Sequence, residues 1–248
     1  VEVAAGASVK RLYSNGFVPM ATQSGEQLGS IAVNELSLSA RFSGDETVNR
    51  GHFVKRHLFG RYPVLTLDLS GGIGGLREND WSYLRPELSL DYKFRLPPAG
   101  AMRMHFNCGA VLGQVPYPLL KLHEGNATYL FDSNAFSCMD YFEFASDRWV
   151  TLMMDHNFNG WFLGKVPLVR RLNLREVVTL RAAYGTLSER NCADAPLVLP
   201  YGMKQMEKPY VEVGAGVTNI LRMFRVEGFW RLTNGPRFVL NLGADLSF

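Results

Sequence analysis

The sequence predicts an all-β chain that forms an antiparallel transmembrane β-barrel, on three observations. Apolar and polar residues alternate in segments of about ten residues separated by turn residues, the pattern of strands with one face in lipid and one in water. No window approaches the ~18 consecutive apolar residues that a membrane-spanning helix needs. No segment of useful length repeats with the helical period. We therefore expect residues 1–248 to form one barrel domain.

The segment 84–96 shows the alternation most clearly. Leu88 and Leu90 fall on one face, and Glu87 and Asp91 fall on the other, because strand side chains point to alternate sides. The same pattern, weaker in some cases, predicts about ten strands, an even number as in bacterial barrels. The other predicted strands are 1–12, 35–42, 63–73, 102–107, 147–158, 175–186, 211–218, 224–233 and 237–248.

The charges on the polar faces favour a membrane barrel over a soluble one. A soluble β-sandwich or lipocalin-like barrel would also alternate, so alternation alone does not decide between them. Arg225, Glu227 and Arg231 lie on the polar face of one predicted strand, and Asp245 lies on the polar face of the last. Such lumen charges avoid, in a hydrated interior, the penalty of several kcal/mol that a dry core imposes.

Net charge and cysteine content argue against several classes of protein. The formal net charge is only +3 and the basic residues are scattered, which does not suit a nucleic-acid surface. The three cysteines are odd in number and far apart, so they indicate no disulfide framework or metal-ligand spacing. The neighbours Asp155 and His156 lack a third ligand. We expect no nucleic-acid partner, no metal and no cofactor.

The end of the chain predicts its orientation. Apolar residues at every second position before the terminal Phe248 resemble the C-terminal signal of outer-membrane barrel proteins. The resemblance implies a bacterial outer membrane, a periplasmic C-terminus and contact with the barrel-assembly machinery during biogenesis. Counting back, the connections 114–146 and 187–209 face outward, as the longest connections should. The signal positions are Leu242, Ala244, Leu246 and Phe248.

Two connections at the periplasmic end, 43–62 and 159–174, are longer than typical periplasmic turns and rich in Lys and Arg. These side chains could bind the headgroups of outer-membrane phospholipids or a periplasmic partner protein. We favour the simpler interpretation, that they are ordinary interfacial side chains that extend toward water. The residues concerned are Lys55, Arg56, Arg61, Lys165, Arg170 and Arg171.

Four stretches carry a family resemblance. They read PYPLLKLHEGN from Pro116, MDYFEFASDRWVTLMMDHNFNG from Met139, KVPLVRRLNLREV from Lys165 and EVGAGVTNILRMFRVEGFWRLTNG from Glu212. Over most of residues 50–248 the chain resembles an uncharacterised Bacteroidota outer-membrane family. Members of that family place a carboxypeptidase-regulatory-like β-sandwich domain before a C-terminal barrel, so the resemblance implies a barrel here.

That barrel is in turn similar to the barrel-assembly and two-partner-secretion transporter superfamily. Barrels of that superfamily have about sixteen strands and fold a long external loop back into the lumen. The corresponding connection here is 114–146, and its candidate residues are His123, Glu124, Gly125 and Asn126.

The resemblance has one departure and leaves one question open. The Arg-Gly-aromatic tip of the superfamily's loop is absent from 114–146, and the tripeptide Arg50-Gly51-His52 lies in another connection. With about sixteen strands as the norm, the strands predicted here would be the C-terminal part of a barrel, with earlier strands or a periplasmic domain before residue 1. Closure of the barrel within this chain is the competing interpretation.

Three functions remain at this point. The first is a non-enzymatic barrel for outer-membrane biogenesis or for translocation of polypeptide or lipid, with a lumen loop as seal and a lateral opening between the first and last strands. The second is a passive channel or a structural anchor of an outer-membrane complex. The third is a protease with its site at the external rim, but closeness in sequence does not give the geometry of acid-base chemistry, so we expect no enzyme. Its candidates would be His123, Glu124, Asp132, Asp140, Glu143 and Asp147.

Overall fold

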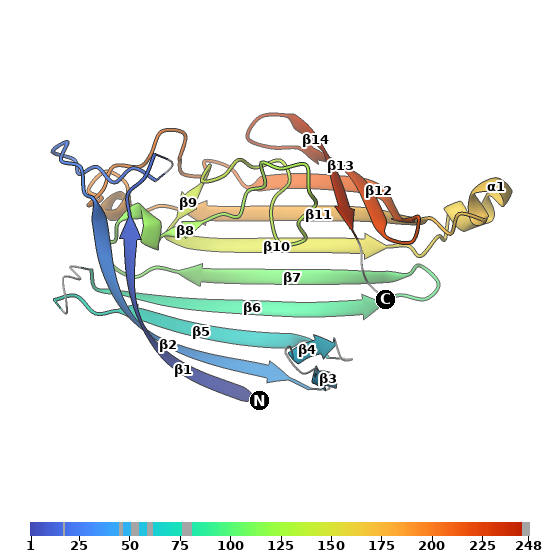
Figure 1. The fold of residues 1–248 in the computed structure, drawn as a ribbon, viewed down its shortest axis with the longest axis horizontal. Coiled ribbons are helices and arrows are strands. Elements are labelled where there is room, and N and C mark those ends of the chain that lie inside the picture. The colour runs from blue at the N-terminus through green and yellow to red at the C-terminus, as the bar shows by residue number, and fades with distance from the viewer. Residues whose placement is uncertain (17, 45–46, 51–54, 59–61, 76–80, 245–248) are drawn as a thin grey trace.

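A single antiparallel sheet of ten strands forms most of the computed structural model, which describes residues 1–248 except 17, 45–46, 51–54, 59–61, 76–80 and 245–248 (Figure 1). The ten predicted strands are confirmed, with small shifts at their ends. Each strand pairs with the next one along the chain. In sheet order they are β1 (Glu2–Tyr13), β2 (Ser30–Ser43), β5 (Val64–Gly72), β6 (Tyr83–Arg95), β7 (Ala101–Ala110), β10 (Arg148–Asn157), β11 (Arg175–Thr186), β12 (Tyr210–Ile220), β13 (Phe224–Arg231) and β14 (Arg237–Ala244).

Short elements occupy the connections. Strands β3 and β4 pair with each other between β2 and β5, and β8 and β9 pair across the base of the β7–β10 connection. Among the described residues, none of the helices has the length and apolar character needed to cross a membrane. The bounds are β3 (Thr47–Arg50), β4 (Lys55–Leu58), η1 (Tyr117–Leu119), β8 (Lys121–Leu122), β9 (Ala145–Ser146), η2 (Leu163–Lys165), α1 (Pro167–Arg170) and η3 (Glu189–Asn191).

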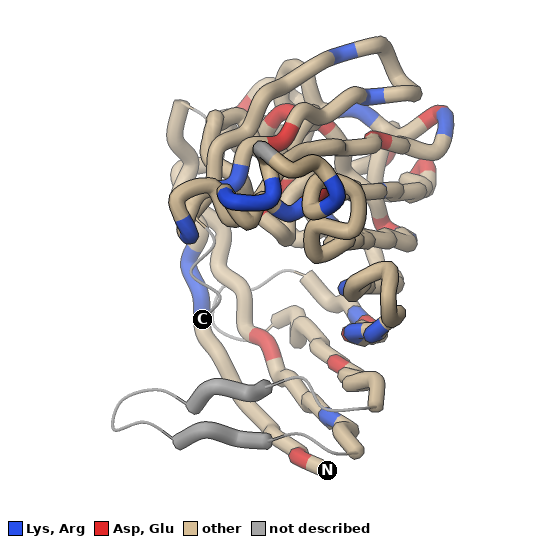
Figure 2. The backbone as a smooth tube through the Cα atoms, turned by 90° about the vertical axis from the view of Figure 1, so that its right-hand side faces the viewer, with Lys and Arg blue, Asp and Glu red and all other residues tan. Residues whose placement is uncertain are grey.

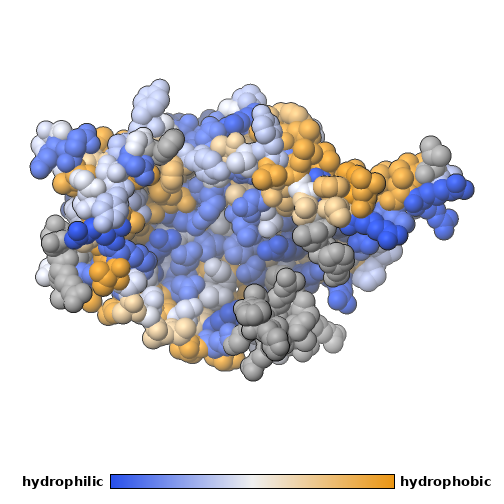
Figure 3. Space-filling view, viewed as in Figure 1, coloured by the Kyte–Doolittle hydropathy of each residue, from blue (hydrophilic) through white to orange (hydrophobic). Residues whose placement is uncertain are grey.

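We call the face of the sheet that the connection 111–147 covers the inner face, and the opposite face the outer face. The two faces have opposite polarity. On the outer face large apolar side chains are exposed, for example Leu38 at 48% and Leu242 at 49%. On the inner face polar side chains are buried, for example Thr179 at 1% and Glu227 at 0%. Hydrophilic residues fill the middle of the face seen in Figure 3. This arrangement is the reverse of a soluble domain, which buries its apolar face.

Strands β1 and β14 are the two edges of the sheet. Within the part of the chain that the structure describes, no ladder joins them. The all-β antiparallel prediction is therefore confirmed, and closure into a barrel stays a prediction. Asp245, Leu246 and Phe248, which the sequence assigned to the last strand, lie outside the described residues.

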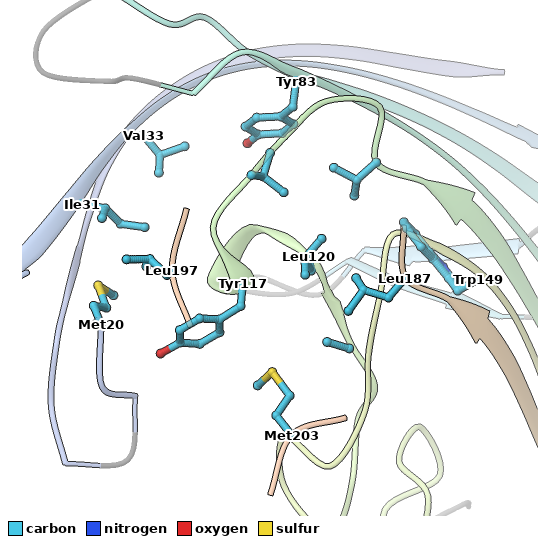
Figure 4. Close-up of a cluster of buried hydrophobic side chains, with 13 residues drawn as sticks. Met20, Ile31, Val33, Tyr83, Tyr117, Leu120, Trp149, Leu187, Leu197 and Met203 are labelled. Atoms are coloured by element: carbon cyan, nitrogen blue, oxygen red, sulfur yellow. The ribbon is translucent and has the colours of Figure 1, made fainter. Parts of the chain in front are cut away.

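An apolar cluster closes one end of the sheet (Figure 4). It joins the ends of β2, β6 and β10 to the connections 14–29, 111–147 and 187–209. Tyr117 and Leu197, from two of these connections, are 1% and 0% exposed. Antiparallel order brings these long connections to the same end, as the orientation argument predicted. The cluster consists of Met20, Ile31, Val33, Tyr83, Val111, Val115, Tyr117, Leu120, Ala145, Trp149, Leu187, Leu197 and Met203.

Candidate functional site: the loop on the inner face

The connection 111–147 folds back over the inner face of the sheet instead of extending away from it (Figure 1). Its two ends are held together by the β8–β9 pair. Its middle reaches the edge strand β14, where the Phe131 N–H donates to the Leu242 carbonyl at 2.8 Å and the Leu242 N–H donates to the Tyr129 carbonyl at 2.7 Å. We call residues 123–144 of this connection the inner loop.

Glu212 of β12 is a fully buried anchor of the inner loop. Its Oε1 accepts the Ser137 N–H and its Oε2 accepts the Cys138 N–H, each at 2.8 Å. The Tyr210 hydroxyl donates to the same Oε2 at 2.8 Å. The side chain is 0% exposed, so these charge-assisted bonds replace water around the carboxylate.

Arg181 of β11 accompanies Glu212 and is also 0% exposed. Its Nη1 lies 3.9 Å from Glu212 Oε1, and its Nη2 donates to the Asp132 carbonyl at 3.0 Å. The guanidinium carbon lies 5.0 Å from the centre of the Phe229 ring. A buried pair of this kind is costly to break, because either partner left alone keeps an uncompensated charge away from water.

Arg231 of β13 forms the second anchor. Its Nη1 and Nη2 donate to the two carboxylate oxygens of Glu143 at 3.1 and 2.8 Å. Nη1 also donates to the Cys138 carbonyl at 3.3 Å. The guanidinium carbon lies 4.9 Å from the Tyr210 ring centre. The planar guanidinium of Arg can donate two hydrogen bonds to one carboxylate, so this bidentate contact fixes the orientation of the loop as well as its position.

Arg225 of β13 lies below the tip of the inner loop. Its Nε donates to Glu227 at 2.8 Å, and its Nη2 lies 3.4 Å from Asp155. The ring of Phe131 covers the guanidinium, with 3.8 Å between its carbon and the ring centre. The Thr179 hydroxyl lies within hydrogen-bond distance of both carboxylates and can donate to either one. The predicted lumen charges Arg225, Glu227 and Arg231 therefore all lie on the inner face.

The four residues singled out in this loop, His123 to Asn126, shape the loop itself. His123 is 2% exposed and its Nε2 pairs with Ser146 Oγ at 3.0 Å. Burial, with a smaller effect of Lys121, lowers the pKa of His123 to about 3. Glu124 is exposed and pairs with Lys121.

Gly125 and Asn126 fix the turn that follows. A Cβ on Gly125 would lie 2.2 Å from the Asp140 carbonyl oxygen, so only glycine fits this close approach of two backbones. The Asn126 side chain accepts the Thr128 N–H at 2.9 Å and donates to the Leu130 carbonyl at 2.6 Å. This local turn is a structural role, which the sequence pattern did not distinguish from a contact with a client.

A cavity of about 830 Å³ lies between the inner loop and the sheet. Gly125, Asn126 and Asp132 line it from the loop. Cations outnumber acids on the strand side: Lys93, Arg103, Arg175 and Arg225 against Asp155. Among the described residues, no group of three or more His, Cys, Asp or Glu side chains could hold a metal ion.

The basic connection 159–174 lies at the other end of the sheet, around η2 and α1, where blue segments of the backbone tube in Figure 2 mark Lys and Arg. Lys165 Nζ lies 5.0 Å from the Trp161 ring centre, and Arg170 and Arg171 are exposed or partly exposed. Lys55 and Arg56 fall in β4, whose side chains are not described, and Arg61 lies outside the described residues. Leu242 and Ala244 of the C-terminal signal point outward and are exposed.

The carboxylates considered for a rim protease form ion pairs or hydrogen bonds with groups other than His123. Asp140 pairs with Arg237 at 2.7 Å, and Asp147 accepts the Ser188 N–H at 2.9 Å. His123 Nδ1 has no hydrogen-bond partner among the described residues. The histidine and the carboxylates are therefore not assembled as an acid-base pair.

Sequence reasoning missed the residues that dock the loop. Glu212, Arg181, Ser137 and Cys138 are not among the site residues that the sequence predicts. A signal was present, since Glu and Arg at inward positions of neighbouring strands need partners. Their partners are backbone groups of a distant loop, which no sequence pattern indicates.

The fold and the site define a class: a curved antiparallel sheet with an apolar outer face, whose polar inner face holds a long loop. Residues 20–190 match the C-terminal domain of a family of unknown function, DUF5686. The chain belongs to this family. No curated protein matches it.

Proposed function

We propose that this chain is the wall of an outer-membrane β-barrel that helps to insert or move polypeptide or lipid, with the C-terminus in the periplasm. The observation that carries the proposal is the reversed polarity of the sheet. Apolar side chains on the outer face are about half exposed, while charged side chains on the inner face are buried beneath a docked loop. Lipid is the solvent that favours such a surface.

The inner loop supports a role beyond that of a passive wall. Anchored by Glu212 and Arg231, it fills part of the space that a barrel would enclose. Residues 129–131 of the same loop bond to the edge strand β14. The loop can therefore seal the lumen and hold the edge at which a client strand would pair, as in other cases of strand addition.

The barrel would be completed by further strands of the full-length protein that pair with β1, or by pairing of β1 with β14. Bare edges in lipid cost several kcal/mol per unpaired backbone group, so the ten-stranded sheet by itself is a poor membrane structure. The resemblance to the transporter superfamily supports the first of these arrangements.

The three native cysteines provide the test of the membrane position. Cys108 points to the outer face, Cys138 is a buried residue of the inner loop, and Cys192 is exposed in the connection 187–209. In cells that express the full-length protein, we expect a charged thiol reagent added outside to label Cys192 alone. A membrane-soluble maleimide should also label Cys108. Rapid labelling of Cys108 by the charged reagent would place the outer face in water and refute the proposal.

A disulfide that joins the inner loop to the edge strand β14 tests the transport role. Leu130 and Leu242 are bridge partners, so the double substitution Leu130→Cys and Leu242→Cys should form a disulfide in a Cys192→Ser background. We expect the oxidised variant to remain folded but to lose outer-membrane integrity, with recovery after reduction. The single variants serve as controls. Full function of the locked protein, together with single-channel conductance in planar bilayers, would favour the passive channel instead, and full function without conductance a structural anchor.

A further inference from the structure

The outer face contains a hollow of about 740 Å³ in its apolar surface. Strand register places two rows of outward side chains across it. One row runs Ala40, Leu67, Leu88, Cys108, Val150, Tyr184. The other row lies one step nearer the loop-bearing end, at Leu38, Leu69, Pro86, Ala110, Arg148 and Thr186.

The hollow follows from the sizes of these side chains. Cys108 and Ala110 on β7 are small and form its floor. Leu67 and Leu69 rise on one side and are 44% and 41% exposed; on the other side Tyr184 is 46% exposed. The hollow is therefore a groove that extends across the strands, from β2 to β11, because six strands line it and each contributes only two outward side chains.

One cation, Arg148, lies at the rim of the groove. Arg148, the first residue of β10, is exposed on the outer face beside Ala110 and Thr186. None of the described residues forms an ion pair with it. An exposed guanidinium at the rim of an apolar groove suits a phosphate, which Arg binds through two parallel hydrogen bonds.

We propose that this groove binds one acyl chain of an anionic phospholipid, with the headgroup phosphate on Arg148. The assignment rests on the proposed function, because it requires the outer face to lie in a membrane. Asp68 and Glu87 also line the hollow, but they occupy inward positions of β5 and β6, so Arg148 is the one charged side chain among its outward residues. The complementarity of a cation and a long apolar channel selects a lipid.

The test uses the full-length protein in phosphatidylcholine vesicles that contain a trace of phosphatidylglycerol with a photoreactive group in its acyl chain. After illumination, labelled peptides are mapped by mass spectrometry. We expect labelling to concentrate on the peptides that contain Cys108 and Val150. Photoreactive phosphatidylcholine should label those peptides several-fold less.

Two variants and a control sharpen the result. Arg148→Gln should abolish the preference for phosphatidylglycerol, and Cys108→Trp should fill the groove and remove the concentrated labelling. Ala215→Trp makes a similar change at an exposed outward position of β12, outside the groove, and should leave labelling unchanged. Arg148→Gln alters no packed side chain, so it decides the matter even if Cys108→Trp fails to fold.

The outcomes separate the two proposals. Even labelling over the whole outer face, or labelling unaffected by either variant, would overturn the groove while leaving the membrane wall intact. Absence of labelling anywhere on the outer face would instead contradict the proposed function.

Discussion

Strands β1 and β11 follow the same alternating sequence pattern, yet they differ in what covers their polar face. In β1 none of the residues is buried, whereas β11 buries every second residue from Val177 to Gly185. The difference comes from the inner loop, which docks on β10–β14 and leaves β1 uncovered. Alternation therefore decides which face is polar, and loop docking decides whether that face is buried.

The ion pairs of the two regions show the same contrast. Lys10 and Glu35, on β1 and β2, lie 3.1 Å apart with side chains 54% and 19% exposed. Arg181 and Glu212, on β11 and β12, are both 0% exposed. Exposed pairs contribute little to stability, while breaking a buried pair is expensive. Each of the following variants tests how far this contrast holds.

The largest effect is expected for Glu212→Ala. The substitution leaves two loop N–H groups and the Arg181 guanidinium without their buried acceptor, which should cost roughly 3–5 kcal/mol of unfolding free energy. Thermal unfolding of the full-length protein in detergent, with trypsin cleavage within 123–144 as a second readout, measures the loss. Glu124→Ala, an exposed carboxylate of the same loop, is the matched control. Equal effects of the two variants would show that Glu212 does not anchor the loop.

Gly125→Ala should have the next largest effect. The added Cβ would lie 2.2 Å from the Asp140 carbonyl, and relief of this overlap should cost about 1–3 kcal/mol by shifting the loop backbone. Gly164→Ala is the control, because a Cβ there meets no atom within 4 Å. The same unfolding assay applies. If the thermal unfolding midpoints of Gly125→Ala and Gly164→Ala coincide, the close backbone contact at Gly125 is not rigid.

Acid should loosen the loop through His123. Its folded pKa of about 3 lies below the ordinary value of 6.5, so the unfolded chain binds the proton first. Stability should be constant above pH 6.5 and fall as the pH drops toward 3, by about 2 kcal/mol at pH 5. The comparison of wild type with His123→Gln isolates this effect, because the variant lacks the titration. An identical acid response in both proteins would contradict the assignment.

The smallest effect is expected for Lys10→Ala in the uncovered region. The pair with Glu35 is more than half exposed on the lysine side, so its loss should change the unfolding free energy by less than about 1 kcal/mol. Measurement at low and high salt would show whether even that contribution is electrostatic. A loss comparable to that of Glu212→Ala would mean that an unseen element covers β1 and β2 in solution.

Much of the fold could be predicted because strand alternation is a local property. Leu88, Leu90, Glu87 and Asp91 show the faces of β6 without reference to any other strand. The β3–β4 and β8–β9 pairs could not be predicted, since strands of two to four residues are too short for alternation to be recognised.

The site was predicted less well than the fold. The sequence indicated which connection would fold inward and named Arg231, because the resemblance and the strand pattern supply both. It could not indicate that Ser137 and Cys138 offer backbone N–H groups to Glu212, because any residue types can do so. His123 and Gly125 were singled out by position in the loop, and their contacts show them to be determinants of its shape.

The sequence positions of the inner loop and of its partners also decide the order in which they are synthesised. Glu212 follows Cys138 by 74 positions, Arg231 follows Glu143 by 88, and Asn241 follows Ser137 by 104. During synthesis the loop therefore emerges long before the strands β12, β13 and β14 that hold it. Residues 129–131 can make their contacts only after β14 has been added, since they bond to Leu242. A chain that lacks β14 would lack these contacts, so full docking of the loop requires the ten-stranded sheet to be complete.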